Sequence, residues 1–102
     1  MLYVMYTAEV MIADMDEYHQ MMSRFLTLVE KHGAETLGAW RTAVGKREEI
    51  TILERYKSMG HFEEVRANIE KEPLAQEFLP KLGRIRTVTS KFLTPVYYSP
   101  MQ

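Results

Sequence analysis

The sequence predicts an α+β protein in which helices cover one face of a four-stranded antiparallel sheet. Three observations lead to this fold class. β-Prone residues recur in four separate stretches. Apolar residues at helical spacing fill two of the intervals between these stretches. The resulting order is strand, helix, strand, strand, helix, strand, which is the βαββαβ order of the ferredoxin-like fold.

The first strand, residues 2–10, carries apolar or β-prone side chains on both of its faces. A strand with one face in water would alternate apolar with polar residues, so we expect both faces to be covered. A helix is expected to begin near Asp14, which fits a capping box with Glu17, and to end at Gly33, which fits a left-handed C-cap. Its inward face is expected to carry Met15, Tyr18, Met22, Phe25, Leu26 and Val29.

A hairpin is expected from residues 36–44 and 49–56, with the chain reversing near Gly45. The length of its loop decides which side chains share a face. A loop of two or four residues places Arg41 on the same face as Ile52 and Glu54. A three-residue loop with a bulge would exchange the faces, and the sequence leaves both alternatives open.

The second helical segment is expected to start at Ser58 and to be interrupted at Pro73, because proline suits the first turn of a new helix. Gly83 is expected to end this second piece. The fourth strand follows over residues 85–93, and residues 95–102 form a C-terminal tail. Residues 1–102 are thus expected to form a single domain, a length that suits one hydrophobic core.

Composition excludes several functional classes. The chain has a net charge of −1 and no basic stripe, so nucleic-acid binding has no electrostatic support. It has no apolar run near the ~20 residues of a membrane span, and its first residues lack the positive leader of a signal peptide. It contains no cysteine, which excludes disulfides and thiolate chemistry and is compatible with a cytoplasmic location.

The coverage of the sheet predicts a partner. Two helical segments can cover only one face, whereas the strands carry apolar residues on both. The simplest solution is a homodimer in which two sheets pack face to face around a two-fold axis. Tyr97 and Tyr98 lie side by side in the short tail, and we expect one of them to pack on the body or on this partner.

The candidate site residues are polar or aromatic side chains of the strands and the first helix. Arg41 could bind an anionic group while Glu54 acts as a base beside Tyr56; alternatively, Arg41 and Glu54 form a structural ion pair. His19 could be a general base or simply an exposed helical histidine. The single tryptophan, Trp40, could line a pocket or pack in an interface, and Tyr3 and Tyr56 could supply pocket hydroxyls.

No local motif adds a cofactor or a metal to this set. The sequence has no glycine-rich phosphate loop, no nucleophilic serine elbow and no pair of histidines four residues apart. We therefore expect no cofactor and no metal site.

Four segments resemble the NIPSNAP family. They are GAWRTAVG at 38–45, the tyrosine and serine of ERYKS at Tyr56 and Ser58, FLPKL at 78–82 and FLTPVYYSP at 92–100. The resemblance implies the dimeric α+β barrel architecture, but it carries no settled reaction. The chain departs from the family pattern, which often has arginine at Tyr6, histidine at Ile52 and an aromatic residue at Glu54.

The sequence therefore predicts a NIPSNAP-like homodimer that binds a small ligand or another protein, with a pocket between sheet and helices. The alternative is a cofactor-free oxygenase or isomerase that acts on a small aromatic or polyketide-like compound. This alternative rests on analogy within the superfamily.

Overall fold

The computed structural model describes all residues from Met1 to Gln102. Its elements, in chain order, are β1 (Leu2–Val10), the 3-10 turn η1 (Ile12–Asp14), α1 (Met15–Lys31), β2 (Glu35–Arg41), β3 (Glu49–Tyr56), α2 (Met59–Glu70), α3 (Pro73–Ile85) and β4 (Arg86–Leu93).

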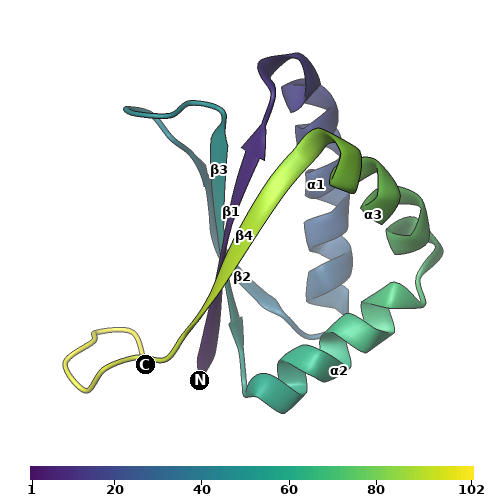
Figure 1. Ribbon diagram of the computed structural model, residues 1–102. Helices are drawn as coiled ribbons and strands as arrows, with labels where there is room; N and C mark the ends of the chain where they lie inside the picture. The colour runs from purple at the N-terminus through teal and green to yellow at the C-terminus, as the bar shows by residue number, and fades with distance from the viewer.

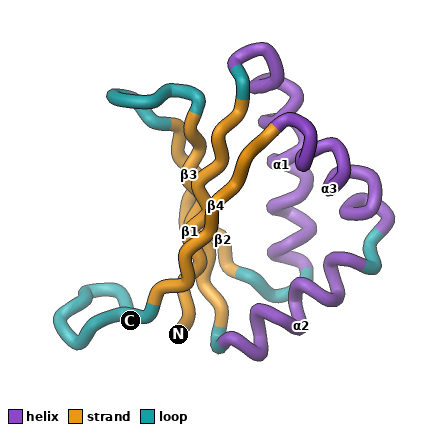
Figure 2. Tube along the Cα trace, viewed as in Figure 1, coloured by secondary structure: helices purple, strands orange, loops and turns teal.

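The strands form one antiparallel sheet in the order β2-β3-β1-β4. All three α-helices lie on the same side of this sheet, so the molecule has two layers (Figure 1). Figure 2 shows the same division, with the strands on one side and the helices on the other. The predicted ferredoxin-like arrangement is confirmed, with the second helical segment divided into α2 and α3.

A bulge in β2 sets which side chains face the helices. Arg41 lies opposite Ile50, but the register shifts between Thr36 and Gly38, so that Thr36 lies opposite Glu54. Arg41 does share the helix-facing side with Glu54, but β2 ends at Arg41 instead of Val44, and the connection at residues 42–48 is longer than any of the loops expected. However, Ile50 and Glu54 are four residues apart on β3, which is about 13 Å along a strand. The expected pairing of Arg41 with Glu54 is therefore wrong.

The helix boundaries follow most of the sequence signals. Gly33 has φ +109° directly after α1, as a left-handed C-cap requires. The Ser58 hydroxyl accepts a hydrogen bond from the His61 amide at 3.1 Å at the start of α2, and Pro73 begins α3. Two expectations were wrong. Asp14 makes no capping hydrogen bond because η1 already holds it in a helical conformation, and α3 continues past Gly83 to Ile85.

The hydrophobic core consists of two clusters between the sheet and the helices. One gathers around Val4, Leu28, Tyr56, Phe62 and Val65 near α2, and the other includes Ala8, Met15, Tyr18, Met22, Phe78 and Leu82 near α3. Tyr6 and Phe25 are only partly buried and pack against both clusters. The boundary between the two clusters is therefore the place where the core is least continuous.

The face of the sheet opposite the helices has no covering element (Figure 1). Cross-strand pairing places Met5, Leu53 and Leu93 on this face. The Trp40 indole, which is 54% exposed, lies on the same side and covers Gly38. We call this surface the open face. It carries apolar side chains although no layer of the same chain packs on it.

The tail after β4 extends past the sheet, beside the N-terminus (Figure 1). The Tyr97 and Tyr98 rings contact each other, with centroids 5.2 Å apart, and are 94% and 75% exposed. Neither ring packs on the body of its own chain, and packing of one of them on a partner stays a prediction. The chain end does return to the sheet, because the Tyr3 hydroxyl donates to the Gln102 carbonyl oxygen at 2.7 Å.

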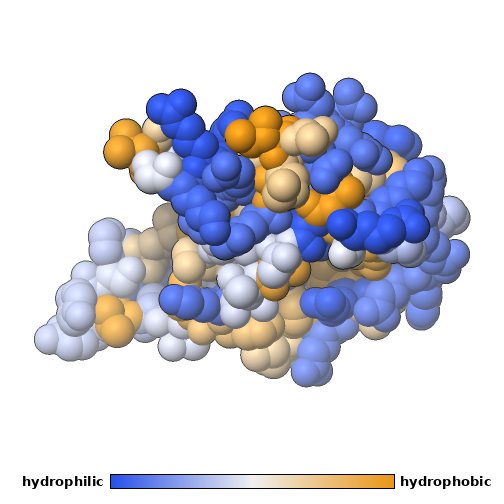
Figure 3. All heavy atoms as spheres, turned by 45° about the horizontal axis from the view of Figure 1, so that its top comes forward, coloured by the Kyte–Doolittle hydropathy of each residue, from blue (hydrophilic) through white to orange (hydrophobic).

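Apolar side chains are also exposed in the connections. Figure 3, in which the top of Figure 1 comes forward, shows groups of apolar atoms among hydrophilic ones at that end. Met11, Ile12 and Val44, in the connections after β1 and β2, are more than half exposed. No helix of the chain combines the length and the hydropathy that crossing a lipid bilayer requires.

Candidate functional site

A cavity of about 210 Å³ lies between the sheet and the helices. Its wall includes members of both core clusters, and most of the wall is apolar. Its exposed rim comes from α2, α3 and β4, where Arg66, Leu79, Val88 and Ser90 reach the surface. The cavity therefore occupies the gap between the two clusters and opens beside the edge strand β4.

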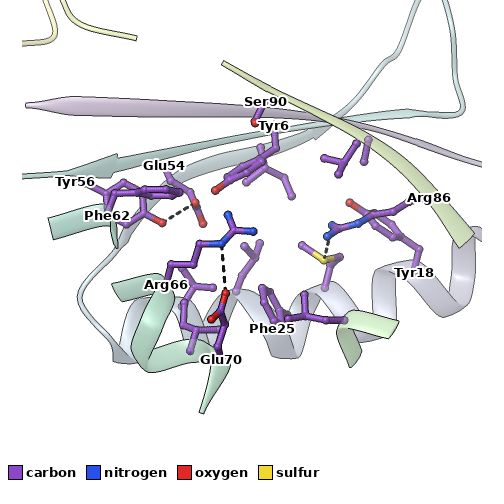
Figure 4. A pocket seen from close by; sticks show the side chains of 18 residues that line it. Tyr6, Tyr18, Phe25, Glu54, Tyr56, Phe62, Arg66, Glu70, Arg86 and Ser90 are labelled. Atoms are coloured by element: carbon purple, nitrogen blue, oxygen red, sulfur yellow. Dashed lines mark hydrogen bonds and ion pairs between the residues drawn. The ribbon is translucent and has the colours of Figure 1, made fainter. Parts of the chain in front are cut away.

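The carboxyl group of Glu54 lies at one end of this cavity. Glu54 is the only charged residue in the buried set, with 3% of its surface exposed. The Tyr56 hydroxyl donates to Glu54 Oε1 at 2.9 Å. The Tyr6 hydroxyl points toward the same carboxyl group from β1 (Figure 4). Alternation along β3 explains this position, because Ile50, Ile52, Glu54 and Tyr56 all face the helices.

Burial controls the protonation of this group. Burial raises the pKa of Glu54, and the hydrogen bonds from Tyr56 and Tyr6 oppose that rise. Burial, together with the nearby charge of Glu54, raises the pKa of Tyr6 to about 12 and raises the pKa of Tyr56 as well. Both phenols therefore keep their protons at neutral pH and act as donors. The Glu54 carboxyl can exchange a proton closer to neutral pH than an exposed glutamate can.

Two arginines reach the cavity at other points. Arg66 on α2 stands at the rim, with its Nε 3.8 Å from Glu70 Oε1, and its guanidinium points toward the space between Tyr6 and Glu54 (Figure 4). Arg86, at the start of β4, donates to Met22 Sδ at 3.8 Å. Tyr18 lies beside Arg86, at the end of the cavity away from Glu54 (Figure 4).

The structure divides the residues that the sequence nominated. Glu54 and Tyr56 line the cavity. His19 and Arg41 instead line a second hollow of about 330 Å³ between α1 and β2; Trp40 also borders it, although its indole covers Gly38 on the open face. Arg41 is exposed there and its Nε donates to the Arg47 carbonyl oxygen at 3.1 Å, so it cannot serve a ligand at Glu54.

Tyr3 belongs to neither hollow. Its side chain lies on the open face, opposite Arg55 and Leu93, and its hydroxyl bonds to the tail. The prediction of a pocket hydroxyl is therefore wrong for Tyr3 but correct for Tyr56, which lines the cavity together with Tyr6 and Tyr18.

Sequence reasoning missed Tyr6, Arg66 and Arg86 as parts of one site. A signal existed for two of them. Tyr6 has the parity of Val4 and Ala8, and Arg86 has the parity of Val88, so each belongs to a strand face with apolar neighbours. No signal placed Arg66, which lies on the solvated side of its helix and reaches the cavity rim only through the length of its side chain.

The arrangement offers proton donors and acceptors but no metal centre. No three or more His, Asp or Glu side chains come together in a way that could hold a metal ion. The chemistry that these residues can provide is hydrogen bonding, charge neutralisation by arginine and proton exchange with Glu54.

Comparisons with known proteins identify the family of this chain. The NIPSNAP family model matches residues 4–100. A NIPSNAP domain protein from Burkholderia xenovorans is 22% identical, with a TM-score of 0.84 over 98% of this chain and 99% of its own. Protein Atu4242 from Agrobacterium tumefaciens is also 22% identical, with a TM-score of 0.87 over 100% of both chains.

A third solved structure carries a different description. It is an antibiotic biosynthesis monooxygenase, 9% identical, with a TM-score of 0.74 over 94% of this chain and 99% of its own. No curated protein sequence matches the chain. At these identities the solved structures establish the fold alone. The family model covers nearly the whole sequence, and the chain therefore belongs to the NIPSNAP family.

Proposed function

We propose that this NIPSNAP-family protein binds a small, largely apolar molecule in the cavity between the sheet and the helices. The observation that carries this proposal is Glu54, a buried carboxyl group with hydroxyl partners at the end of an apolar cavity. A buried carboxyl group costs stability, so its presence at the end of a cavity supports a functional role. An apolar cavity of about 150 Å³ admits benzene, so 210 Å³ accommodates a single ring with a short substituent.

The methyl group of Met22 provides a local readout. Titration of toluene into protein with ¹³C-labelled methionine methyls is expected to shift the Met22 resonance, because Met22 lines the cavity. The resonance of Met11, which is 70% exposed outside the cavity, is expected to stay in place.

A matched pair of variants at Ser90 identifies the binding site. Ser90 lies on the cavity rim of the edge strand. Ser90→Leu is expected to fill the opening and abolish the toluene shift, whereas Ser90→Ala keeps it. A Met22 resonance that does not respond to toluene in the wild-type protein contradicts the proposal.

A second candidate function is proton transfer by Glu54, in the manner of a cofactor-free isomerase. The raised pKa of the buried carboxyl favours it. In such a step the Glu54 carboxylate takes a proton from a carbon next to a carbonyl. The C–H electron pair moves to form the enolate, and the O–H bond of Glu54 later returns the proton to carbon. An oxygenase role has no comparable support, since the monooxygenase likeness shows only the fold.

Hydrogen exchange separates this enzyme from a plain binding protein. Phenylacetone in D₂O is expected to exchange its benzylic hydrogens faster with the protein than in buffer, and Glu54→Gln is expected to remove that acceleration while toluene still binds. If phenylacetone shifts the Met22 resonance but its hydrogens exchange only at the buffer rate, the proton-transfer function is wrong and the binding function remains.

We also propose that a second copy of the chain covers the open face and that the protein acts in the cytoplasm. Apolar side chains at Met5, Leu53 and Leu93, without a covering layer, support the homodimer. Absence of cysteine fits a reducing compartment. Fractionation of cells that express the tagged protein checks the location, and recovery outside the cytoplasm would overturn it.

A further inference from the structure

The Tyr18 hydroxyl is a buried group without a hydrogen bond of ordinary geometry. Tyr18 is 1% exposed; burial raises the pKa of its hydroxyl, and the Arg86 guanidinium beside it opposes that rise. Tyr18 lines the cavity, and its hydroxyl points inward beside Arg86 (Figure 4). Buried hydroxyls in proteins are almost always hydrogen-bonded, so an unpaired one that faces a cavity indicates a ligand atom as its partner.

Arg86 supplies a second, independent observation. Its side chain forms no ion pair with any acidic residue, and its only hydrogen bond of ordinary geometry is the one to the sulfur of Met22, although it lies close enough to the Tyr18 hydroxyl to lower the pKa of that group. A thioether is a weak acceptor, so most of the donor capacity of this guanidinium is unused. A partly buried arginine that lacks a carboxylate partner is matched by an oxyanion, which a guanidinium can bind through two parallel hydrogen bonds.

The rest of the cavity sets the orientation of such an oxyanion. Glu54 lies at the opposite end of the cavity from Tyr18 and Arg86, so a carboxylate bound beside Arg86 avoids the charge of Glu54 (Figure 4). The other acidic side chain of the wall, Glu70, lies at the rim and is engaged with Arg66. Phe25 lies between the two ends (Figure 4), and it contributes to a mostly apolar wall there.

We propose that Tyr18 and Arg86 form an oxyanion subsite that binds the carboxylate of a small aryl or alkyl carboxylic acid, whose apolar part extends toward Glu54. This inference rests on the proposed binding function and adds the chemical class of the ligand.

Phenylacetate and phenylacetamide test the subsite, because they share shape and differ in charge. Both are titrated against ¹³C-methyl methionine, with toluene as the uncharged reference. Met22 contacts Arg86, so its resonance reports binding at this end. Phenylacetate is expected to bind at least about tenfold more tightly than phenylacetamide, the gain of one charge-assisted hydrogen bond.

Variants at Arg86 identify the source of the preference. Arg86→Gln is expected to remove the preference for phenylacetate over phenylacetamide. Arg86→Lys is expected to keep part of this preference, because lysine has the positive charge but cannot form two parallel hydrogen bonds with a carboxylate. Arg84→Gln is the matched control, because Arg84 lies exposed two residues earlier and does not line the cavity.

Tyr18→Phe gives a readout that a purely structural role would not produce. Removal of an unpaired hydroxyl is expected to leave the melting temperature unchanged or raised, while phenylacetate binding weakens. Toluene binding is expected to persist in both the Tyr18→Phe and the Arg86→Gln variants.

The outcomes separate the two proposals. If toluene binds but phenylacetate has no advantage over phenylacetamide, or if the advantage survives Arg86→Gln, the oxyanion subsite is wrong and the binding cavity stands. If toluene, phenylacetate and phenylacetamide all fail to move the Met22 resonance, the proposed binding function fails and the subsite fails with it.

Discussion

At the scale of single residues, Glu54 is the position where stability and function conflict. The Glu54 carboxyl lies among apolar side chains, and only the hydroxyls of Tyr56 and Tyr6 solvate it. Removal of a carboxylate from water disfavours its charged form, which is why the native state raises its pKa. A glutamine of the same shape could accept the hydrogen bond from Tyr56 without this penalty.

This conflict predicts how stability depends on pH. The native state binds the Glu54 proton more tightly than the unfolded chain, whose glutamate has its ordinary pKa of about 4.5. Well below pH 4.5, Glu54 is protonated in both the native and the unfolded state, so it does not make the free energy of unfolding depend on pH. As the pH rises from there through the raised native pKa, the unfolded chain releases the proton first, and the native state loses stability.

Glu54→Gln removes this loss. We consider the free energy of unfolding of the variant minus that of the wild type. This difference is expected to increase from pH 4.5 up to the native pKa of Glu54 and then to level off. Urea denaturation at unit steps from pH 4 to pH 8 measures the difference, and Glu63→Gln at an exposed position of α2 is the control. A difference that stays flat with pH, or falls as pH rises, would contradict the raised pKa.

How far the sequence predicts the site also becomes clear at this scale. Alternation along β3 was sufficient to place Glu54 and Tyr56 on one face, and helical periodicity placed Tyr18 on the inward face of α1. Neither pattern shows which strand position meets which helix position. Tyr18 and Arg86 are 68 residues apart in the chain, and only the packing of α1 against the sheet edge brings them together.

At the scale of elements, the register of the hairpin explains why Arg41 does not meet Glu54: Arg41 lies opposite Ile50, and Thr36, beyond a bulge in β2, lies opposite Glu54. An extra residue, Leu37, enters β2 between Thr36 and Gly38, so the parity of the strand changes along its length. Gly38 fits this place because the Trp40 indole lies against it, where a side chain would collide. The GAWR segment predicted a strand, but no residue in it indicates on its own where the extra residue enters.

Element boundaries were predictable where a single residue supplies the physical cause. Gly33 and Ser58 mark helix ends through positive φ and a capping hydroxyl, respectively. The end of α3 was not predictable in this way. Ile85 packs partly buried against the second core cluster, and this tertiary contact outweighs the weak tendency of Gly83 to end a helix.

At the scale of the whole molecule, the sheet has only one covered face. Composition and strand patterns predicted this imbalance, because apolar residues on both faces of β1 exceed what two helical segments can bury. The same patterns leave the geometry of any second copy undetermined. Stable protein–protein interfaces bury roughly 800 Å² on each partner.

The central position of the open face gives a direct test of the proposed homodimer. Leu53 lies on the inner strand β3, opposite Met5, and is partly buried. Leu53→Glu places a carboxylate on each of two sheets that pack face to face. Like charges brought together in an interface cost several kcal/mol, so the variant is expected to be monomeric at micromolar concentration.

Sedimentation velocity measures the outcome. The wild-type protein is expected to sediment at twice the 12.0 kDa of one chain, and Leu53→Glu at the mass of one chain. Val44→Glu is the control, because Val44 is 94% exposed in the β2–β3 connection, away from the sheet, and its variant is expected to remain dimeric. A wild-type protein that sediments as a monomer would show that the open face does not bind a second copy. If the Leu53→Glu protein is still dimeric, the dimer interface is not the open face. The exposed apolar tail at Val96–Tyr98 is then the next candidate for the interface.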